Sequence, residues 1–199
     1  MPLQKNQTIP LSIDSISSDG SGVGRHDGQV VFVPGTAVGD VILAKIVKTA
    51  KTHAFGIVEE IEIPGPGRQT PDCPISGRCG GCVFRHLTYE AELAAKQGFV
   101  EDALSRIGKI NAEVLPILPS PQESRYRNKV QYPVAPWPEG TILHGFYASR
   151  SHRIIACDDC LLQPELLNQI AAKTVALMEK LDIPAYDEAT GGGFVRHIY

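Results

Sequence analysis

The chain has 199 residues, of which 43% are hydrophobic and 21% are charged, so its composition is that of a globular protein and excludes wholesale disorder. A formal net charge of −3 argues against a protein that coats nucleic acid by overall charge. The first residues contain no apolar signal segment, and no apolar run approaches the ~20 residues of a membrane span. We therefore expect a cytoplasmic protein with no membrane partner.

Residues 5–62 have the pattern of about five short strands. The apolar or β-branched runs are residues 8–14, 29–33, 41–48 and 54–61. A glycine cluster over residues 18–24 indicates a turn, because glycine accepts a positive φ at no steric cost. Short strands separated by glycine turns predict a small closed barrel. The proline- and glycine-rich residues 64–71 predict a stiff linker after it.

The second part of the chain alternates helical and strand patterns. Apolar residues at three- and four-residue steps predict helices over residues 88–107 and about 164–182. Strands are expected at residues 129–134, 141–147 and 152–156. In the later helix, the expected buried stripe is Leu167, Ile170, Thr174, Leu177 and Leu181. Residues 194–199 have the pattern of a strand for which the sequence offers no partner strand. We therefore interpret the chain as the front part of a longer protein.

Five cysteines form a pattern typical of metal binding. Cys73, Cys79 and Cys82 have the spacing C-x5-C-x2-C, and Cys157 and Cys160 follow far downstream. In a reducing compartment, clustered cysteines indicate a metal or chemistry more often than disulfides. Four thiolates suit zinc, which favours the two C-x2-C pairs, or an iron–sulfur cluster, which would use the triplet and one remote cysteine. The spacing leaves both alternatives open.

One segment is basic in an otherwise acidic chain. Residues 106–153 carry seven positive and three negative side chains. Lysine and arginine can neutralise phosphates, and tyrosine can stack on an unpaired base. The alternative is a solvated strand edge whose charges oppose aggregation. Beside a barrel of a kind that often binds oligonucleotides, we favour RNA binding. The candidate RNA-binding residues are Arg125, Tyr126, Arg127, Lys129, Arg150 and Arg153.

Together these motifs resemble the bacterial RNA uracil-C5 methyltransferases that carry an N-terminal TRAM domain and an iron–sulfur cluster, the 23S rRNA type included. The matching segments are Asp19–Gly24, Val31–Asp40, Cys73–Cys82 with His86, Tyr126–Lys129, Gly145–Tyr147 and Asp159–Cys160. The resemblance implies a 4Fe-4S cluster held by Cys73, Cys79, Cys82 and Cys160, with Cys157 spare. It also implies methyl transfer from S-adenosylmethionine to uracil C5 in ribosomal or transfer RNA.

The resemblance also yields an expected organisation. The fold class is α+β: a five-stranded OB-like TRAM barrel, then a mixed α/β central domain with the cysteine loop, and no Rossmann-like S-adenosylmethionine domain. The expected segments are residues 1–63 (RNA-binding barrel), 64–87 (linker and cluster loop) and 88–199 (central domain, incomplete at its C-terminus). The resemblance places the S-adenosylmethionine domain, with its glycine-rich loop, nucleophilic cysteine and general base, just beyond Tyr199. None of the five cysteines matches that nucleophile, so no catalytic or S-adenosylmethionine-binding residue is carried over.

The expected function is therefore the RNA-recognition and 4Fe-4S-binding N-terminal portion of such a methyltransferase, inactive alone. We expect a monomer whose partner is RNA and not DNA. The alternative is a non-enzymatic RNA-binding module with a structural zinc site made by four cysteines.

Overall fold

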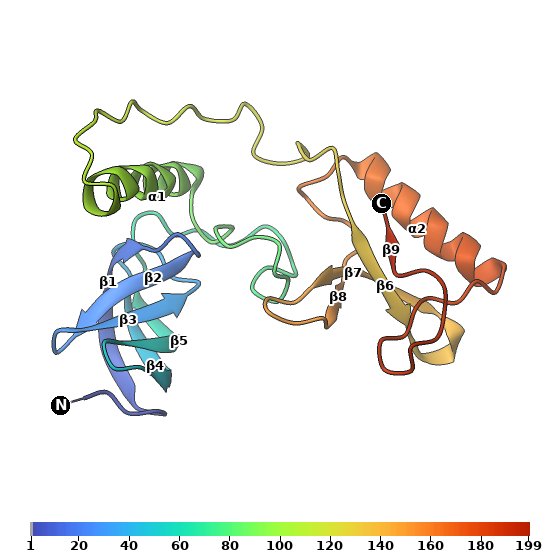
Figure 1. The fold of residues 1–199 in the computed structure, drawn as a ribbon, viewed down its shortest axis with the longest axis horizontal. Helices are drawn as coiled ribbons and strands as arrows, with labels where there is room; N and C mark the ends of the chain where they lie inside the picture. Colours follow the sequence, from blue (N-terminus) through green and yellow to red (C-terminus); the bar gives the residue numbers. More distant parts are fainter. Residues whose placement is uncertain (1) are drawn as a thin grey trace. The chain divides into compact units, whose positions relative to one another are not determined.

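A computed structural model describes residues 2–199, which divide into two units (Figure 1). Unit 1 comprises the chain up to Asp72 and residues 83–119, and unit 2 comprises residues 73–82 and 120–199. The helix after the cysteine loop therefore belongs to the same unit as the barrel, and the loop itself belongs to the same unit as the later sheet. Among residues 2–199, no helix is long and apolar enough to cross a bilayer.

Unit 1 contains a closed five-stranded barrel with the strand order β1-β2-β3-β5-β4, the closed form that the sequence predicted. The strands are β1 (Thr8–Ile16), β2 (Ser21–His26), β3 (Gln29–Pro34), β4 (Val41–Thr49) and β5 (His53–Ile63). All neighbours are antiparallel except β3 and β5, which are parallel. Alternation places Ile9, Leu11 and Ile13 of β1 in the core with apolar residues of the other strands.

Strand β2 was not expected, because its glycines were interpreted as a turn. Gly22 and Gly24 lie where neighbouring chain segments approach the strand backbone closely. A Cβ atom on Gly22 would stand 1.9 Å from the Thr36 hydroxyl oxygen, and one on Gly24 would stand 2.3 Å from the Ser12 carbonyl oxygen. The glycines therefore serve close packing inside the barrel wall.

The segment that follows β5 is fixed to the barrel rather than forming a free linker. The buried Asp40 carboxylate accepts hydrogen bonds from the backbone N–H groups of Ala37 (2.6 Å) and Gly65 (2.8 Å). It also accepts one from Nε of Arg68 at 3.0 Å. A Cβ on Gly65 would meet the Val38 carbonyl oxygen at 2.2 Å, so only glycine fits there.

Helix α1 (Tyr89–Asp102) begins at the expected place and packs beside the barrel (Figure 1). The Thr88 hydroxyl caps its N-terminus by accepting from the Ala91 N–H at 3.3 Å. Residues Ala103–Ile107 continue it as a π-helical turn. No residue of α1 is fully buried, so the helix has no buried stripe.

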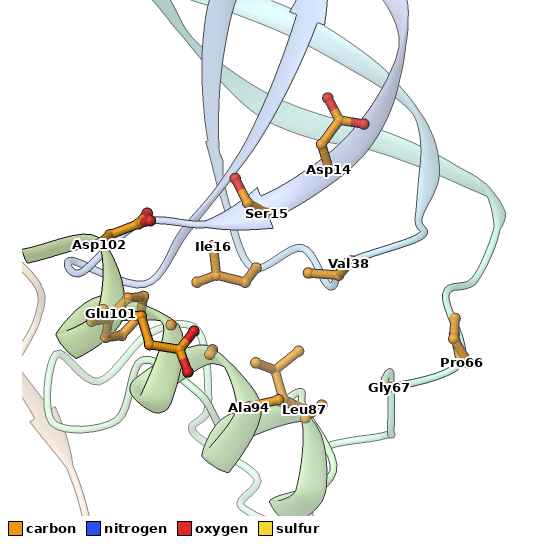
Figure 2. A pocket seen from close by; sticks show the side chains of 14 residues that line it. Asp14, Ser15, Ile16, Val38, Pro66, Gly67, Leu87, Ala94, Glu101 and Asp102 are labelled. Carbon is orange, nitrogen blue, oxygen red and sulfur yellow. The ribbon is translucent and has the colours of Figure 1, made fainter. Parts of the chain in front are cut away.

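A cavity of about 420 Å³ lies between β1 and α1 (Figure 2). Small residues of α1 form one wall, and Asp14, Glu101 and Asp102 are the acidic members of its lining. The cavity therefore has the wrong charge to receive a phosphate group.

Unit 2 is a four-stranded antiparallel sheet with the order β8-β7-β6-β9 and one helix packed on it. Its elements are β6 (Tyr132–Pro136), a 3-10 turn (Pro138–Gly140), β7 (Ile142–Tyr147), β8 (Ile154–Ala156), α2 (Glu165–Lys180) and β9 (His197–Ile198). The core contains Val134, Val175, Met178 and Ala185. Strand β9, expected to be unpaired, pairs with β6 through Tyr132 and Ile198.

The buried face of α2 differs from the predicted one. The buried residues are Asn168, Ala171, Val175 and Met178. The expected Ile170, Leu177 and Leu181 are exposed, at 47%, 54% and 56%. Both sets of residues recur at three- and four-residue steps. The set that packs against the sheet is the one that contains the polar Asn168. The prediction of the stripe was therefore wrong by about one residue in phase.

Candidate functional site

The cysteine loop lies against the hairpin formed by β7 and β8. The backbone N–H of Gly80 donates to the carbonyl oxygen of Tyr147 at 2.9 Å, and Cys79 forms a β-bridge with Ala148. A Cβ on Gly80 would stand 2.9 Å from the backbone nitrogen of Ser149. Glycine between Cys79 and Cys82 therefore allows the loop to dock on the hairpin.

This docking brings cysteines from distant parts of the sequence close together. Burial raises the pKa of Cys79 first, and the charges of Cys160 and Cys73 raise it further. The charges of Cys160, Cys73 and Cys79 likewise contribute to the raised pKa of Cys157. Cys157 is buried and the other four cysteines are half-buried. Within residues 2–199, no set of three or more cysteine, histidine or carboxylate side chains converges into a metal-binding geometry.

The two cysteines near the end of β8 have opposite acidities. The pKa of Cys160 falls to about 6, and the largest cause is a hydrogen bond that the Cys157 thiol donates to its sulfur. Burial opposes the fall. The Leu162 backbone, Gln163 and the charge of Arg127 lower the pKa further. The same hydrogen bond, together with burial, raises the pKa of Cys157. Cys160 therefore favours the thiolate and Cys157 the thiol, which makes Cys157 a poor nucleophile.

Arg125 holds the segment that carries Cys160. Its guanidinium forms a two-pronged ion pair with the Asp159 carboxylate, with N–O distances of 2.6 and 2.8 Å. It also donates to the carbonyl oxygens of Cys160 (3.2 Å) and Gln163 (3.0 Å). The first cause of the lowered pKa of Asp159 is its hydrogen bond from Arg125. The backbone of Arg125 has a φ of +59°, an uncommon conformation that these contacts stabilise.

A second set of polar contacts joins this segment to α2 and β6. The Asn168 amide donates to Asp159 at 2.7 Å, and its oxygen accepts from the backbone N–H of Cys160 at 3.3 Å. The buried Tyr132 hydroxyl lies 2.6 Å from the Asn168 oxygen and 2.7 Å from the Gln163 oxygen. Burial is the first cause of the raised pKa of Tyr132, which remains a neutral donor. Cys160 therefore sits on a rigid polar frame.

The basic residues predicted to bind RNA all lie in unit 2, but they differ in availability. Arg125 is occupied by Asp159, and its main chain pairs with Leu161. Arg127 is half-buried beside Cys160, and its N–H donates to Leu162 at 2.8 Å. The exposed members are Tyr126, Lys129, Arg150 and Arg153. Arg150 and Arg153 flank the β7–β8 turn against which the cysteine loop lies.

We expect Arg125→Ala to loosen the Cys160 segment rather than to remove a phosphate contact. Amide hydrogen exchange at Leu161, Leu162 and Gln163 should accelerate, because the variant removes the guanidinium that joins Asp159 to the carbonyl groups of Cys160 and Gln163. Lys129→Ala, which removes an exposed charge from the same segment, is the control and should leave exchange unchanged. Unchanged exchange in Arg125→Ala, together with weaker RNA binding, would contradict the structural role.

Tyr132, Gln163 and Asn168 were not identified from the sequence. Their residue types are common in helices and strands, and nothing in their spacing marks them. The one available signal is that polar residues occupy positions on α2 and at the start of β6. The structure buries both of these positions.

The comparisons with known proteins agree with this architecture. Residues 2–58 match the family described as "TRAM domain". The chain is 42% identical over 196 residues to a protein of Listeria monocytogenes named "Uncharacterized RNA methyltransferase", covering 98% of this chain and 43% of that protein. A protein of the same description from Halalkalibacterium halodurans is 39% identical, covering 99% of this chain and 43% of the relative. The chain thus spans less than half the length of these curated relatives.

A solved structure shares the fold. The crystal structure of Pyrococcus abyssi tRNA (uracil-54, C5)-methyltransferase in complex with S-adenosyl-L-homocysteine matches 94% of this chain and 41% of its own, with a TM-score of 0.63 and 22% identity. At this identity the likeness concerns the fold alone.

These matches correct the predicted fold class. We expected a fragment defined by the lack of a Rossmann-like domain and left incomplete at its C-terminus. Instead, 98% of the chain matches an RNA methyltransferase relative and 94% matches a methyltransferase structure, so the fold is methyltransferase-like throughout the matched residues. The last strand of the chain is also paired rather than open, since β9 pairs with β6. Residues 2–58 are thus similar to TRAM domains, and nearly the whole chain is similar to part of bacterial proteins named RNA methyltransferases.

Proposed function

We propose that these residues form the RNA-recognition part of an S-adenosylmethionine-dependent RNA uracil-C5 methyltransferase that acts in the cytoplasm on 23S rRNA or tRNA. The observation that carries the proposal is the match of nearly the whole chain to proteins named RNA methyltransferases, beginning with a TRAM domain. Uracil C5 as the target position is part of this proposal and follows the resemblance carried by the sequence motifs. We further propose that the chain acts as a monomer.

The proposed role of unit 2 is to bind the RNA backbone through its exposed cations. Lys129, Arg150 and Arg153 are exposed and lie in the same unit, whereas Arg125 is neutralised by Asp159. Tyr126 is 52% exposed, so its ring is accessible for stacking on a base. Sequence-independent binding of this kind positions an RNA without selecting a particular uridine.

We expect Lys129→Ala and Arg153→Ala each to weaken RNA binding and to reduce its salt dependence. Removal of one phosphate-binding cation should lower the slope of log affinity against log salt by about 0.7 for a single strand. Lys180→Ala removes the same charge from the far end of α2 and serves as the control. Fluorescence anisotropy with a labelled uridine-rich RNA at several salt concentrations measures both quantities. Slopes that match the wild type would place the RNA elsewhere.

We propose that four of the five cysteines serve a metal centre and that none of the five supplies the nucleophile for methyl transfer. They occur only at the docked loop and at the Cys157–Cys160 pair. Residues 1–199 should therefore not methylate RNA by themselves. Incubating them with RNA and labelled S-adenosylmethionine, beside an active uracil-C5 methyltransferase as the control, tests this statement. Label at uracil C5 above background would contradict it.

The proposed centre is a 4Fe-4S cluster held by Cys73, Cys79, Cys82 and Cys160. The fit rests on a soft donor set in one unit and on Gln163, whose fully buried Nε2 has no hydrogen-bond partner among the described residues. The same side chain helps to lower the pKa of Cys160. A thiolate or sulfide there would satisfy the buried donor.

When bound, such a cluster cross-links the cysteine loop to the segment after β8. The chain's own residues position the ligands: Gly80 docks the loop on the hairpin, and Arg125 and Asn168 fix the backbone at Cys160. A zinc site using Cys157 in place of Cys73 is the competing arrangement. Anaerobically purified protein that is colourless and contains zinc would favour a zinc-bearing RNA-binding module instead.

A further inference from the structure

The cavity between β1 and α1 has the size of a ligand site. Its volume is about 420 Å³, and small-molecule sites in proteins typically measure ~300–1,000 Å³. All of its lining residues belong to unit 1, so the cavity lies within one compact part of the chain. It is separate from the exposed cations and the cysteines of unit 2, and the proposed function gives it no role.

Most of the cavity wall is apolar. Ile16 of β1 and Val38 lie on one side of the space, and Leu87 and Ala94 lie on the other (Figure 2). Phe99 of α1 also lines it. Transfer of an apolar group from water into such a space is favourable, so the cavity suits a ligand with a hydrocarbon body.

Gly98 keeps the cavity open from the side of α1. Glycine is the poorest helix former after proline, yet Gly98 lies within the helix. Close packing does not require glycine there, because a Cβ on Gly98 would meet no atom within 4 Å. The wall residues Ala91, Ala94 and Ala95 of the same helix are also short. An unfilled apolar space lowers stability, so the sequence of α1 preserves a space that a larger side chain at position 98 would fill.

The charge around the cavity identifies the other half of the ligand. Asp14, Glu101 and Asp102 line the cavity, and none of the described lining residues is basic. Arg106 forms an ion pair with Asp102 at 3.0 Å, but Glu101 accepts only from the neutral Gln97 amide, at 2.9 Å. An apolar space with negative charge beside it complements a cation and disfavours an anion.

We propose that this cavity binds a small organic cation, an ammonium or guanidinium group carried on an apolar body. The apolar body lies against Ile16, Leu87 and Gly98, and the cationic group lies near the Asp14 and Glu101 carboxylates. The inference goes beyond the proposed function and does not rest on it, since the chemistry that favours this ligand opposes the phosphates of RNA.

The test uses the full chain and three probes that share a hydrocarbon chain and differ in charge: n-hexylammonium, n-hexanol and n-hexanoate. Titrations followed by amide NMR signals locate each probe and give its dissociation constant. We expect n-hexylammonium to shift the signals of Ile16, Leu87 and Gly98. Its affinity should exceed that of n-hexanoate by about tenfold, because the carboxylates attract the one and repel the other. The affinity of n-hexanol should lie between these two.

Two variants separate the apolar and the charged parts of the site. Gly98→Leu fills the cavity and should abolish binding of all three probes, while the open space and the higher helix propensity of leucine preserve the fold. The double variant Asp14→Asn/Glu101→Gln should weaken n-hexylammonium binding by about tenfold and leave n-hexanol binding unchanged. Glu113→Gln, an exposed glutamate of the same unit outside the lining, is the matched control. Melting temperatures verify that each variant is folded.

Several results would overturn the inference. If no probe shifts the signals of the lining residues, the cavity is not a ligand site. Equal affinities for n-hexylammonium and n-hexanoate would refute recognition of a cation, and so would equal losses in Glu113→Gln and in the double variant. Binding that survives in folded Gly98→Leu would place the probe elsewhere. RNA affinity is measured separately, so failure of this inference leaves the proposed function standing, and a chain that binds no RNA leaves this inference standing.

Discussion

Replacing Asp40 by alanine is expected to lower the free energy of unfolding by about 3–5 kcal/mol, because the change leaves a largely buried cation and two backbone donors without a partner. The Asp40 side chain is fully buried, and that of Arg68 is only 16% exposed. The N–H groups of Ala37 and Gly65 would lose their acceptor as well. Urea unfolding followed by circular dichroism measures the loss.

The exposed Asp14 supplies the control, and Asp14→Ala should change stability by no more than about 0.5 kcal/mol. A similarly small change in Asp40→Ala would show that the Asp40–Arg68 pair stabilises nothing. Such a result would also return residues 64–71 to the status of a free linker.

The same carboxylate predicts a pH dependence. Burial alone would raise the pKa of Asp40, but hydrogen bonds from Arg68, Gly65 and Ala37 and the charge of Arg68 together lower it. A folded-state pKa below the unfolded value of about 3.9 means that the stabilisation is complete above that pH. It is lost as pH falls through the folded-state pKa. The stability difference between wild type and Asp40→Ala should therefore shrink as the pH falls below about 4.

Replacing Cys160 by serine is expected to remove most of the bound iron, whereas Cys157→Ser should retain it. Cys160 is the thiol on the rigid frame, with its backbone fixed by Arg125 and Asn168. Serine is a poor ligand for iron that favours thiolate. Iron and acid-labile sulfide measured in anaerobically purified protein, with the visible absorption band, give the result.

Cys157→Ser is the matched control, because it makes the same atom change three residues away. Loss of iron in Cys157→Ser with retention in Cys160→Ser would make the assignment of Cys160 wrong. Loss in both, accompanied by bound zinc in the wild type, would support the arrangement with two C-x2-C pairs.

The elements that the sequence predicts well are those whose patterns are local. Alternation in β1 and the threonine cap of α1 depend on a few neighbouring residues, and both occur in the structure. The sequence did not predict strand β2, because the need for glycine at positions 22 and 24 comes from distant residues. Thr36 and Ser12 approach these positions so closely that a Cβ would not fit. Glycine signals a turn from sequence alone, although in a barrel wall it serves close approach equally well.

The phase of α2 and the role of Arg125 depend on long-range contacts and could not be predicted. Both faces of α2 carry apolar residues at helical spacing, and only the sheet decides that Val175 and Met178 face the core. Arg125 stands in a basic run that resembles a phosphate-binding segment. Its partner Asp159 lies 34 residues away in the sequence, so the local pattern of charges does not predict the ion pair.

The grouping of the chain into units also depends on contacts that cross the sequence. The cysteine loop joins the later sheet through Gly80 and Tyr147, while Arg68 and His86 join the barrel through Asp40 and Thr36. Segments adjacent in sequence therefore belong to different units.

RNA affinity of the chain, measured as a function of salt concentration, tests the central proposal most directly. Wild-type protein should bind uridine-rich single-stranded RNA, and its affinity should fall steeply as salt rises, because the exposed cations of unit 2 displace counterions from phosphates. A chain that remains folded by circular dichroism yet binds no RNA at low salt would contradict the account.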